Sequence, residues 1–174
     1  MIVQRASQRA GVPWRNGLGV QYEIACDGSL PDDWTWRLST ADITQNVPFS
    51  FYPGVKREFC VADGSGVVLS INGIDHRCEP QSITSFSGDD VVAAALINSP
   101  VQALNLMLRG VSTARVLNVV RAGQHVVQCQ VVVALTGSAT VEIGNQVLEL
   151  QLLDAIVDFA GIDVIIRIGD IAAF

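Results

Sequence analysis

The stretch Ile83-Thr84-Ser85-Phe86-Ser87-Gly88-Asp89-Asp90-Val91-Val92 occurs a second time, in altered form, as Ile156-Val157-Asp158-Phe159-Ala160-Gly161-Ile162-Asp163-Val164-Ile165. The two copies share Ile, Phe, Gly and Asp at matching places, and each ends in two apolar residues. With an offset one residue shorter, residues 69–73 (Leu-Ser-Ile-Asn-Gly) overlay residues 141–145 (Val-Glu-Ile-Gly-Asn). This ordered series of matches indicates that one β unit occurs twice in the chain. A strand-and-turn pattern shared by two unrelated β units is the alternative.

Strand signals dominate the whole chain. Short runs rich in Val, Ile and aromatic residues alternate with Gly, Asn, Asp and Pro, and no long 3.6-residue periodicity occurs. The expected strands are Val20–Cys26, Trp34–Ala41, Val55–Ala62, Val67–Ile71, Val91–Ile97, Leu104–Arg109, Val116–Val120, Val126–Leu135, Thr140–Ile143, Val147–Leu150 and Val164–Ile168. Two-residue hairpin turns are expected at Asn72-Gly73 and Gly144-Asn145, because Gly and Asn tolerate positive φ.

Closely spaced strands that form a repeated unit predict an all-β fold of two fused cupin-like antiparallel β-barrels or jelly rolls, a bicupin. We expect a first barrel over residues 1–110, which carries the ligand pocket, and a second, degenerate unit over residues 111–174. The two units are expected to pack as a single compact structure. Folds of this type bind ligands in the mouth or lumen of the barrel.

Composition excludes several classes of protein. Of 174 residues, 49% are hydrophobic and 16% charged, which excludes a disordered linker. The apolar runs fall far short of the roughly 20 residues of a membrane-spanning helix. The start has no features of a secretory signal, so we expect a cytoplasmic location without membrane association. The net charge is −6 and the eleven Lys and Arg residues are scattered, so nucleic-acid binding is not expected.

Motifs for metal binding and nucleophilic catalysis are missing from the sequence. The two histidines, His76 and His125, lie far apart in different halves, and His76 is expected on a solvated loop. The four cysteines form no Cys-x-x-Cys pair and are expected to be reduced, buried thiols. No Gly-x-Ser-x-Gly elbow or phosphate-binding loop occurs. We therefore expect no metal, no cofactor and no catalytic residue.

Arg57 gives the sharpest functional signal. Strand alternation places it on one face with Val55, Phe59 and Val61, which indicates a guanidinium that points into the barrel. A buried charge without compensation is costly, so an anion is expected to meet it. The second copy of the repeat has Cys129 at the matching position, so the fold does not require an arginine there. A salt bridge to a local acid such as Glu23, or an arginine that reaches solvent at the rim, remains an alternative.

Three other segments contain polar side chains at positions where strand or loop geometry aligns them. Pro13–Gly19 combines Trp14 and Asn16 with two glycines, which is typical of a loop folded close to another group. In two strands, alternation places polar residues opposite a hydrophobic face, and the pattern does not decide whether they line a pocket or meet water. The candidate ligand-binding residues are Arg57, Trp14, Asn16, Glu23, Arg37, Ser39, Asn105 and Met107.

These segments together resemble the HutD/Ves family of bacterial cupin-like proteins. The motifs are Pro13-Trp14-Arg15-Asn16-Gly17 followed by Glu23-Ile24, Trp36-Arg37-Leu38-Ser39, Phe49-Ser50-x-x-Pro53-Gly54-x-x-Arg57, Phe86-x-Gly88-Asp89 and Leu104-Asn105-Leu106-Met107-x-Arg109. They span residues 10–110 approximately, and Leu18 departs from the pattern, because many relatives have Gly there.

The resemblance implies a two-barrel cupin fold without metal ligands, and it maps the family's pocket arginine onto Arg57. HutD-like members are associated with histidine utilisation and are thought to bind a small acidic compound of that pathway, such as urocanate or a formylated or formimino glutamate. Ves-like members are linked to cold and stress responses. The resemblance therefore implies a small carboxylate as partner and a regulatory or sensing role.

Two alternatives of other classes stay open at this point. The first is a metal-free isomerase or hydrolase that acts on a similar small acid, with Glu23 or Asn105 beside Arg57. The second is a surface interaction module of a stress response, because a chain with few charges has room for an apolar contact patch, including a homodimer interface.

Overall fold

The computed structural model describes residues 1–29, 32–110 and 115–174, apart from the side chain of Phe159. These residues form seventeen strands and one short 3-10 turn, η1 (Ala6–Gln8). Every pairing between named strands is antiparallel, so the predicted all-β, antiparallel class is confirmed. Within this described part, no helix has the length and hydrophobicity needed to cross a membrane.

The chain divides into two compact units. The larger unit comprises Ala10–Arg115, and the smaller unit comprises Met1–Arg9 together with Val116–Phe174. The expected boundary after Gly110 borders residues 111–114, which lie outside the described residues, and the two units of the structure divide after Arg115. The first nine residues, expected in the first barrel, belong to the smaller unit because β1 (Ile2–Gln4) pairs with a strand of that unit.

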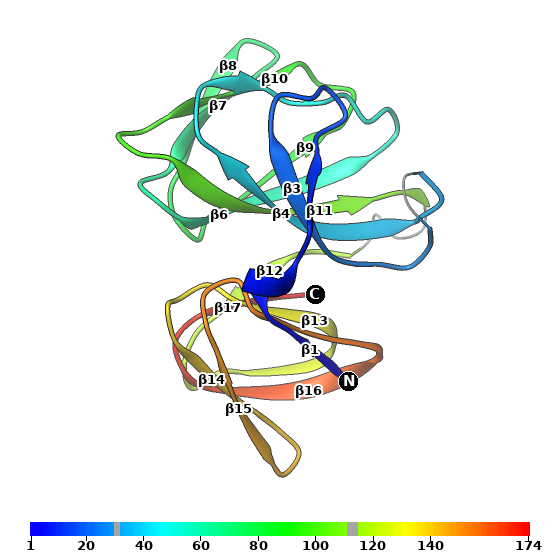
Figure 1. Ribbon diagram of the computed structural model, residues 1–174, viewed down its shortest axis with the longest axis vertical. Helices are drawn as coiled ribbons and strands as arrows, with labels where there is room; N and C mark the ends of the chain where they lie inside the picture. Colours follow the sequence, from blue (N-terminus) through cyan, green and yellow to red (C-terminus); the bar gives the residue numbers. More distant parts are fainter. Residues whose placement is uncertain (30–31, 111–114) are drawn as a thin grey trace. The chain divides into compact units, whose positions relative to one another are not determined.

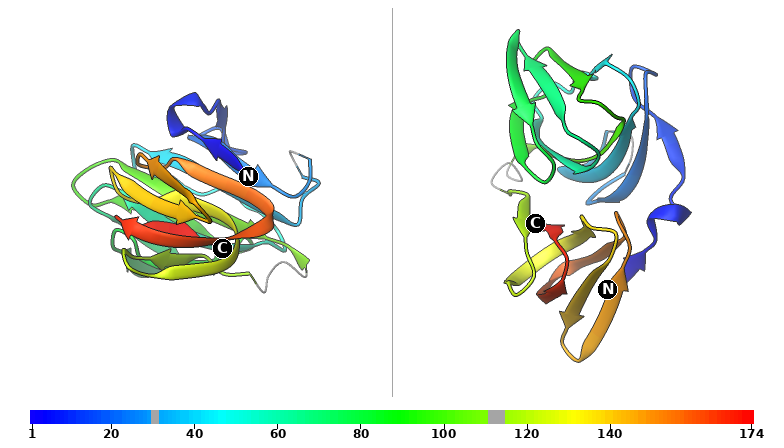
Figure 2. Two further views of the ribbon diagram at one scale, coloured as in Figure 1. Left: turned by 90° about the horizontal axis from the view of Figure 1, so that it is seen from below. Right: turned by 90° about the vertical axis from the view of Figure 1, so that its left-hand side faces the viewer.

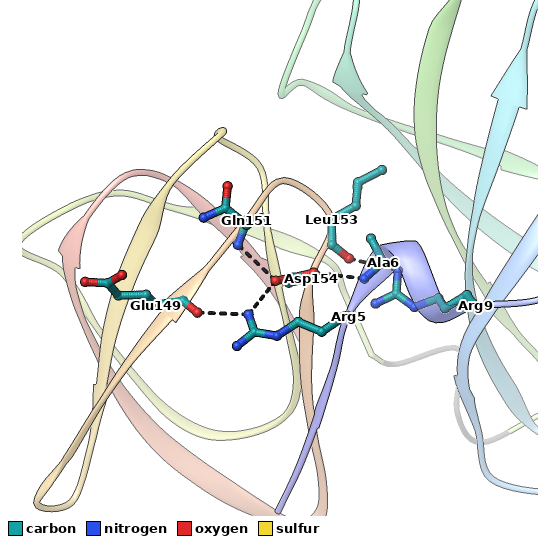
Figure 3. A network of polar contacts seen from close by, with 7 residues as sticks. All are labelled: Arg5, Ala6, Arg9, Glu149, Gln151, Leu153 and Asp154. Carbon is teal, nitrogen blue, oxygen red and sulfur yellow. Dashed lines mark hydrogen bonds and ion pairs between the residues drawn. The ribbon is translucent and has the colours of Figure 1, made fainter.

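Polar contacts fix the N-terminal segment to the smaller unit (Figure 3). Asp154, whose side chain is only 3% exposed, accepts hydrogen bonds from Arg5 Nη1 at 2.6 Å, from the Ala6 N–H at 2.8 Å and from the Gln151 N–H at 3.0 Å. Arg9 Nη1 donates to the carbonyl of Leu153 at 2.8 Å. One buried carboxylate therefore holds both the start of the chain and the turn at Gln151, which follows β15 (Gln146–Leu150).

The larger unit contains two sheets that curve around a common interior (Figures 1 and 2). The six-stranded sheet has the order β2-β3-β4-β11-β6-β9 and the four-stranded sheet the order β5-β10-β7-β8. Their strands are β2 (Gly11–Pro13), β3 (Val20–Cys26), β4 (Trp36–Ile43), β5 (Val47–Pro48), β6 (Lys56–Asp63), β7 (Val67–Ile71), β8 (Ile74–Cys78), β9 (Ile83–Ser87), β10 (Val92–Leu96) and β11 (Val101–Leu108).

Apolar residues of both sheets form the interior of the larger unit. Phe59 and Val61 of β6, Leu69 of β7 and Ala103 of β11 are fully buried in this cluster. They alternate with residues of the opposite face, as the period of two in a strand requires. Burial of a large side chain of this kind contributes roughly 1.5–3 kcal/mol, so this cluster supplies much of the unit's stability.

The smaller unit has one sheet with the order β12-β17-β13-β16-β14-β15, and β1 pairs with β16 beside this series (Figure 1). Its remaining strands are β12 (Asn118–Val120), β13 (His125–Ala134), β14 (Ala139–Ile143), β15 (Gln146–Leu150), β16 (Ala155–Ile168) and β17 (Ile171–Ala173). Cys129, which the repeat aligns with Arg57, is buried in the apolar core of this unit.

Strand pairing follows the repeat seen in the sequence. In the larger unit Cys60 lies opposite Ile83, and in the smaller unit Val132 lies opposite Ile156. The sequence repeat aligns Cys60 with Val132 and Ile83 with Ile156, so the same pair of strands forms in both units. The β7–β8 hairpin corresponds in the same way to the β14–β15 hairpin. One difference is that β9 and β10 are separate strands, whereas β16 runs on from Ala155 to Ile168 through Gly161, whose φ is +85°.

Several predicted strand bounds differ from the structure. The predicted strand Trp34–Ala41 is β4, displaced toward the C-terminus, and β16 begins at Ala155 rather than at Val164. β8 and β9 were not predicted, because their sequences Ile-Asp-His-Arg-Cys and Ile-Thr-Ser-Phe-Ser lack a hydrophobic run. The expectation of a loop at His76 is wrong. His76 lies on β8, which pairs with β7 after the hairpin turn, and it is exposed opposite Leu69 of β7.

Candidate functional site

One face of the six-stranded sheet gathers polar side chains from four neighbouring strands. The register places Arg37 of β4, Met107 of β11, Arg57 of β6 and Phe86 of β9 in one row across the sheet. The adjacent row contains Glu23, Ser39, Asn105 and Phe59. Strand alternation therefore brings segments that are far apart in the sequence onto a common surface.

A cavity opens over this face within the larger unit. The space free of atoms is about 380 Å³ when it is counted out to the open mouth and the solvent there is included. Its lining residues are Trp14, Gln21, Ser39, Ala41, Ile43, Phe49, Ser50, Tyr52, Arg57, Asn105 and Met107. Aromatic and aliphatic groups therefore surround a small set of hydrogen-bonding groups and one cation.

Arg57 is the charged residue of this cavity. Its side chain is 5% exposed, and its guanidinium carbon lies 4.9 Å from the ring centroid of Phe86 and 5.1 Å from that of Phe49. Such contacts stabilise a cation through the negative ring face by about 0.5–2 kcal/mol each, but they do not neutralise it. The aromatic rings thus hold the guanidinium in place and leave its charge uncompensated.

Hydrogen bonds use only part of the Arg57 guanidinium. Nη2 donates to Asn105 Oδ1 at 2.9 Å and Nη1 to the Ser50 carbonyl at 3.4 Å, while buried Nε has no partner among the described residues. None of the ion pairs in that part of the chain includes Arg57. The predicted inward orientation of Arg57 is confirmed, and its charge meets no carboxylate among the residues that the structure describes.

Burial lowers the pKa of Arg57 to about 10; Tyr52 opposes this change and the charge of Arg37 adds to it. Arg57 is therefore still protonated at neutral pH. A buried ion without a counter-charge costs several kcal/mol even after local relaxation. An anion that entered the cavity would remove part of this cost.

Asn105 presents its amide group in a defined orientation. An arginine has only donors, so the contact with Arg57 must use the Asn105 carbonyl oxygen, and the amide NH2 is left as a donor. No hydrogen bond within the described residues involves that nitrogen. Two kinds of donor, an amide and a guanidinium, therefore lie next to each other at the cavity wall.

Glu23 and Arg37 form a separate ion pair. Arg37 Nε donates to Glu23 Oε2 at 2.6 Å, and neither residue lines the cavity. Burial raises the pKa of Glu23, and Arg37 opposes this effect. The alternative that Glu23 neutralises Arg57 is thus wrong, because Glu23 compensates the charge of Arg37 instead.

In the loop that contains Trp14 and Asn16, Trp14 lines the cavity and Asn16 does not. The Trp14 ring lines the cavity and makes an edge-to-face contact with Phe49 at 5.9 Å between centroids. Asn16 is exposed and does not line the cavity; its Nδ2 donates to the Pro48 carbonyl at 3.0 Å. Of the eight predicted site residues, five line the cavity: Trp14, Ser39, Arg57, Asn105 and Met107.

Six lining residues were not predicted. Gln21, Ala41 and Ile43 follow from the period of two, because they share a strand face with Glu23 and Ser39. Phe49, Ser50 and Tyr52 lie in an irregular segment, so no periodicity indicates their direction. Their nearness to Arg57 depends on how this segment folds back against β9 and β10, where Tyr52 N–H donates to Gly88 O and Phe49 N–H to Val92 O.

Histidine and acidic residues do not converge in the described part of the chain. No group of three or more His, Cys, Asp or Glu residues there could hold a metal ion. His76 and His125 are both exposed and lie in different units.

Comparisons with known proteins show the family and the fold. The HutD family model matches residues 6–165. Protein Ves of Citrobacter koseri is 38% identical over 98 residues, which are 55% of this chain and 51% of that protein. The chain thus spans about half the length of the curated relatives it matches.

Solved structures resemble nearly the whole chain. HutD from Pseudomonas fluorescens SBW25, in its formate condition, has a TM-score of 0.81 at 28% identity and covers 99% of this chain and 95% of its own. A Cupin 2 conserved barrel domain protein from Leptotrichia buccalis has a TM-score of 0.58 at 9% identity, over 89% of this chain and 86% of its own, which shows the fold alone. The fold is cupin-like, and the chain belongs to the HutD family.

Proposed function

We propose that this protein binds a small carboxylate at Arg57 and serves a regulatory or sensing role rather than a catalytic one. The observation that carries the proposal is a buried guanidinium that lines a cavity and has no acidic partner among the described residues. A guanidinium fork matches a carboxylate geometrically, and each charge-assisted hydrogen bond contributes about 1.5–3 kcal/mol.

The names of relatives suggest where such a ligand comes from. A family member from Pseudomonas fluorescens carries the name HutD, and its structure is described as a formate condition. Formate is the smallest carboxylate, and histidine-degradation intermediates such as urocanate and formylated or formimino glutamate carry the same group. These compounds are therefore our candidate ligands.

Each unit is, in our proposal, one cupin-like barrel, and only the larger one has kept a ligand site. The matching strand order of the two units supports this duplication. Cys129, at the position equivalent to Arg57, is a buried thiol in an apolar core. The second unit would thus preserve the architecture without the cation.

Thermal unfolding with added ligand tests the proposal. Ligand at a hundred times its dissociation constant adds about 2.7 kcal/mol of stability, which for a chain of this length raises Tm by roughly 5–10 °C. We expect such a shift with at least one of formate, urocanate, formylglutamate and formiminoglutamate. The shift should disappear in Arg57→Met and persist in Arg77→Met, which removes an exposed arginine of the same unit.

No shift with any of these compounds at millimolar concentration and pH 7 would contradict the proposal. Conversion of a compound, followed by its ultraviolet spectrum or mass, would replace binding with catalysis as the function. A shift that survives in Arg57→Met would move the binding site away from this cavity.

A further inference from the structure

We infer that the ligand of this cavity is a monocarboxylate, a single negative charge on an otherwise neutral body, and that dicarboxylates are rejected. The inference rests on the proposed function, because it concerns the same site. It follows from the number of charges at the cavity wall and from the state of the cations nearby.

The cavity offers one charge. Among the described residues that line it, Arg57 is ionic, whereas Gln21, Ser39, Ser50, Tyr52 and Asn105 are neutral. One carboxylate therefore balances the site. A second carboxylate held inside the cavity would have no counter-charge there, and transfer of an unpaired carboxylate out of water is strongly unfavourable.

The other arginine in the same row of the sheet is already engaged. Arg37 lies in the same row as Arg57, two strands away across β11. At a strand spacing of about 4.8 Å, the backbones of the two arginines are about 10 Å apart. Glu23 neutralises Arg37 through the 2.6 Å contact, and that pair keeps a net charge of zero. A dicarboxylate would have to displace Glu23 before it could reach Arg37.

Two more arginines near the loop share a single acid. Arg15 and Arg109 both contact Asp32, with Arg109 Nη2 at 3.8 Å from its carboxylate. Neither of them lines the cavity. One carboxylate cannot neutralise two guanidiniums, so this group keeps one positive charge, but it lies outside the cavity on side chains that are 29–55% exposed, where solvent and salt screen it.

The rest of the wall favours a flat or apolar ligand body. Trp14, Ile43, Phe49 and Met107 provide aromatic and aliphatic contact surface. Neutral donors and acceptors, above all the Asn105 amide beside Arg57, can pair with an uncharged polar group of the ligand.

Calorimetric titration with matched acids tests this inference. The pairs are acrylate with fumarate, butyrate with succinate, and benzoate with terephthalate, each at pH 7.5. We expect the monocarboxylate to bind at least tenfold more tightly in every pair for which binding is detected. Among the candidate ligands of the proposed function, formylglutamate and formiminoglutamate each carry two carboxylates, whereas formate and urocanate carry one, so the inference favours formate and urocanate.

A variant with a second cation should weaken the preference for monocarboxylates. Gln21→Lys adds a charge on the half-buried wall of β3, and we expect the monocarboxylate advantage to fall at least tenfold. Ile74→Lys adds the same charge at an exposed site of the same unit and should leave the ratio unchanged. A second variant, Glu23→Gln, frees the Arg37 charge and should also reduce the ratio.

The possible failures are distinguishable. Equal or tighter binding of a dicarboxylate by the unmodified protein would overturn this inference and leave the carboxylate site in place. If Gln21→Lys does not improve dicarboxylate binding, the charge count is not what sets the selectivity, and the inference is likewise overturned. If no acid of either kind binds, the proposed function fails and the inference falls with it.

Discussion

Arg57 Nη2 donates a 2.9 Å hydrogen bond to Asn105 Oδ1, so the strongest polar contact of this buried cation is with a neutral amide on the adjacent strand. A carboxylate of the same shape at position 105 would neutralise the cation. The chain instead pairs Arg57 with a group that orients it without removing its charge. This relationship makes the site testable with single-atom changes.

Asn105→Asp should supply Arg57 with a carboxylate of the protein itself and thereby weaken the binding of external carboxylates. The new carboxylate takes the place of the amide beside Arg57 and adds the counter-charge that the amide lacks, so we expect the unliganded protein to gain unfolding free energy, by about 1.5–3 kcal/mol. External carboxylates should bind at least tenfold more weakly, because their counter-charge is taken. Tm without ligand and calorimetric titration measure the two effects.

Asn105→Leu is the matched control for that change. It removes the acceptor without adding charge, so the unliganded protein should lose about 1–3 kcal/mol and Arg57 should still attract an anion. If Asn105→Asp binds carboxylates as tightly as the unmodified protein does, Arg57 is not their counter-ion.

Arg57→Met should separate binding from stability. Methionine has a similar length and fits among Phe49, Phe86 and Met107, and the substitution removes a buried charge that has no counter-ion in the described part of the chain. Replacement of buried charges by apolar groups of similar volume is often neutral or stabilising. We therefore expect a Tm no lower than that of the unmodified protein, with carboxylate binding abolished. A fall in unfolding free energy of more than about 3 kcal/mol would instead identify Arg57 as a structural residue.

Regular alternation explains which parts of this site can be predicted from sequence. The period of two on β6 correctly turns Arg57 inward, and the same rule applied to β4 and β11 brings Ser39, Asn105 and Met107 to one face. The rule says nothing about pairing between strands. It therefore left open whether Glu23 meets Arg57 or Arg37, which depends on a register with a bulge between Glu23 and Ala25.

The irregular segments lie beyond what periodicity can predict. Phe49, Ser50 and Tyr52 line the cavity because a segment without regular hydrogen bonding folds back over the sheet. β9 was missed for a related reason, since its Thr and Ser residues carry little hydrophobic signal and pairing with β6 holds it in the sheet. In both cases tertiary contacts, rather than local propensity, determine the conformation.

Gly19→Ala should displace Trp14 from the cavity wall. A Cβ atom at position 19 would lie 2.6 Å from the Trp14 ring, and the ring would have to move away from Phe49 to avoid it. Overpacking of this kind costs about 1–3 kcal/mol. We expect a lower Tm, a change in tryptophan fluorescence and weaker carboxylate binding. Leu18→Ala, at an exposed position of the same loop, should change stability by less than about 0.5 kcal/mol.

Asp154→Asn should remove an acid-sensitive contribution to the stability of the smaller unit. The Ala6 N–H, the Arg5 guanidinium and the Gln151 N–H all donate to this carboxylate, and together they hold its pKa below the ordinary value although burial alone would raise it. As pH falls below about 3.9, the ordinary value, the unfolded chain takes up the proton before the folded protein does, so acid favours unfolding. The stabilisation is present above that pH and is lost as pH falls through the lower folded value.

In Asp154→Asn, the new NH2 group points at an N–H that donated a hydrogen bond to the carboxylate, so that hydrogen bond is lost. The loss should lower the unfolding free energy by about 1–3 kcal/mol at pH 7. The variant should also lose less stability than the unmodified protein between pH 5 and pH 2, because it has no proton to take up there. Denaturant unfolding across this pH range measures both effects. Glu149→Gln is the matched control, since Arg5 contacts the carbonyl of Glu149 and not its carboxylate. If the unfolding free energies of Asp154→Asn and the unmodified protein fall in parallel with pH, Asp154 is not the group whose protonation lowers the stability in acid.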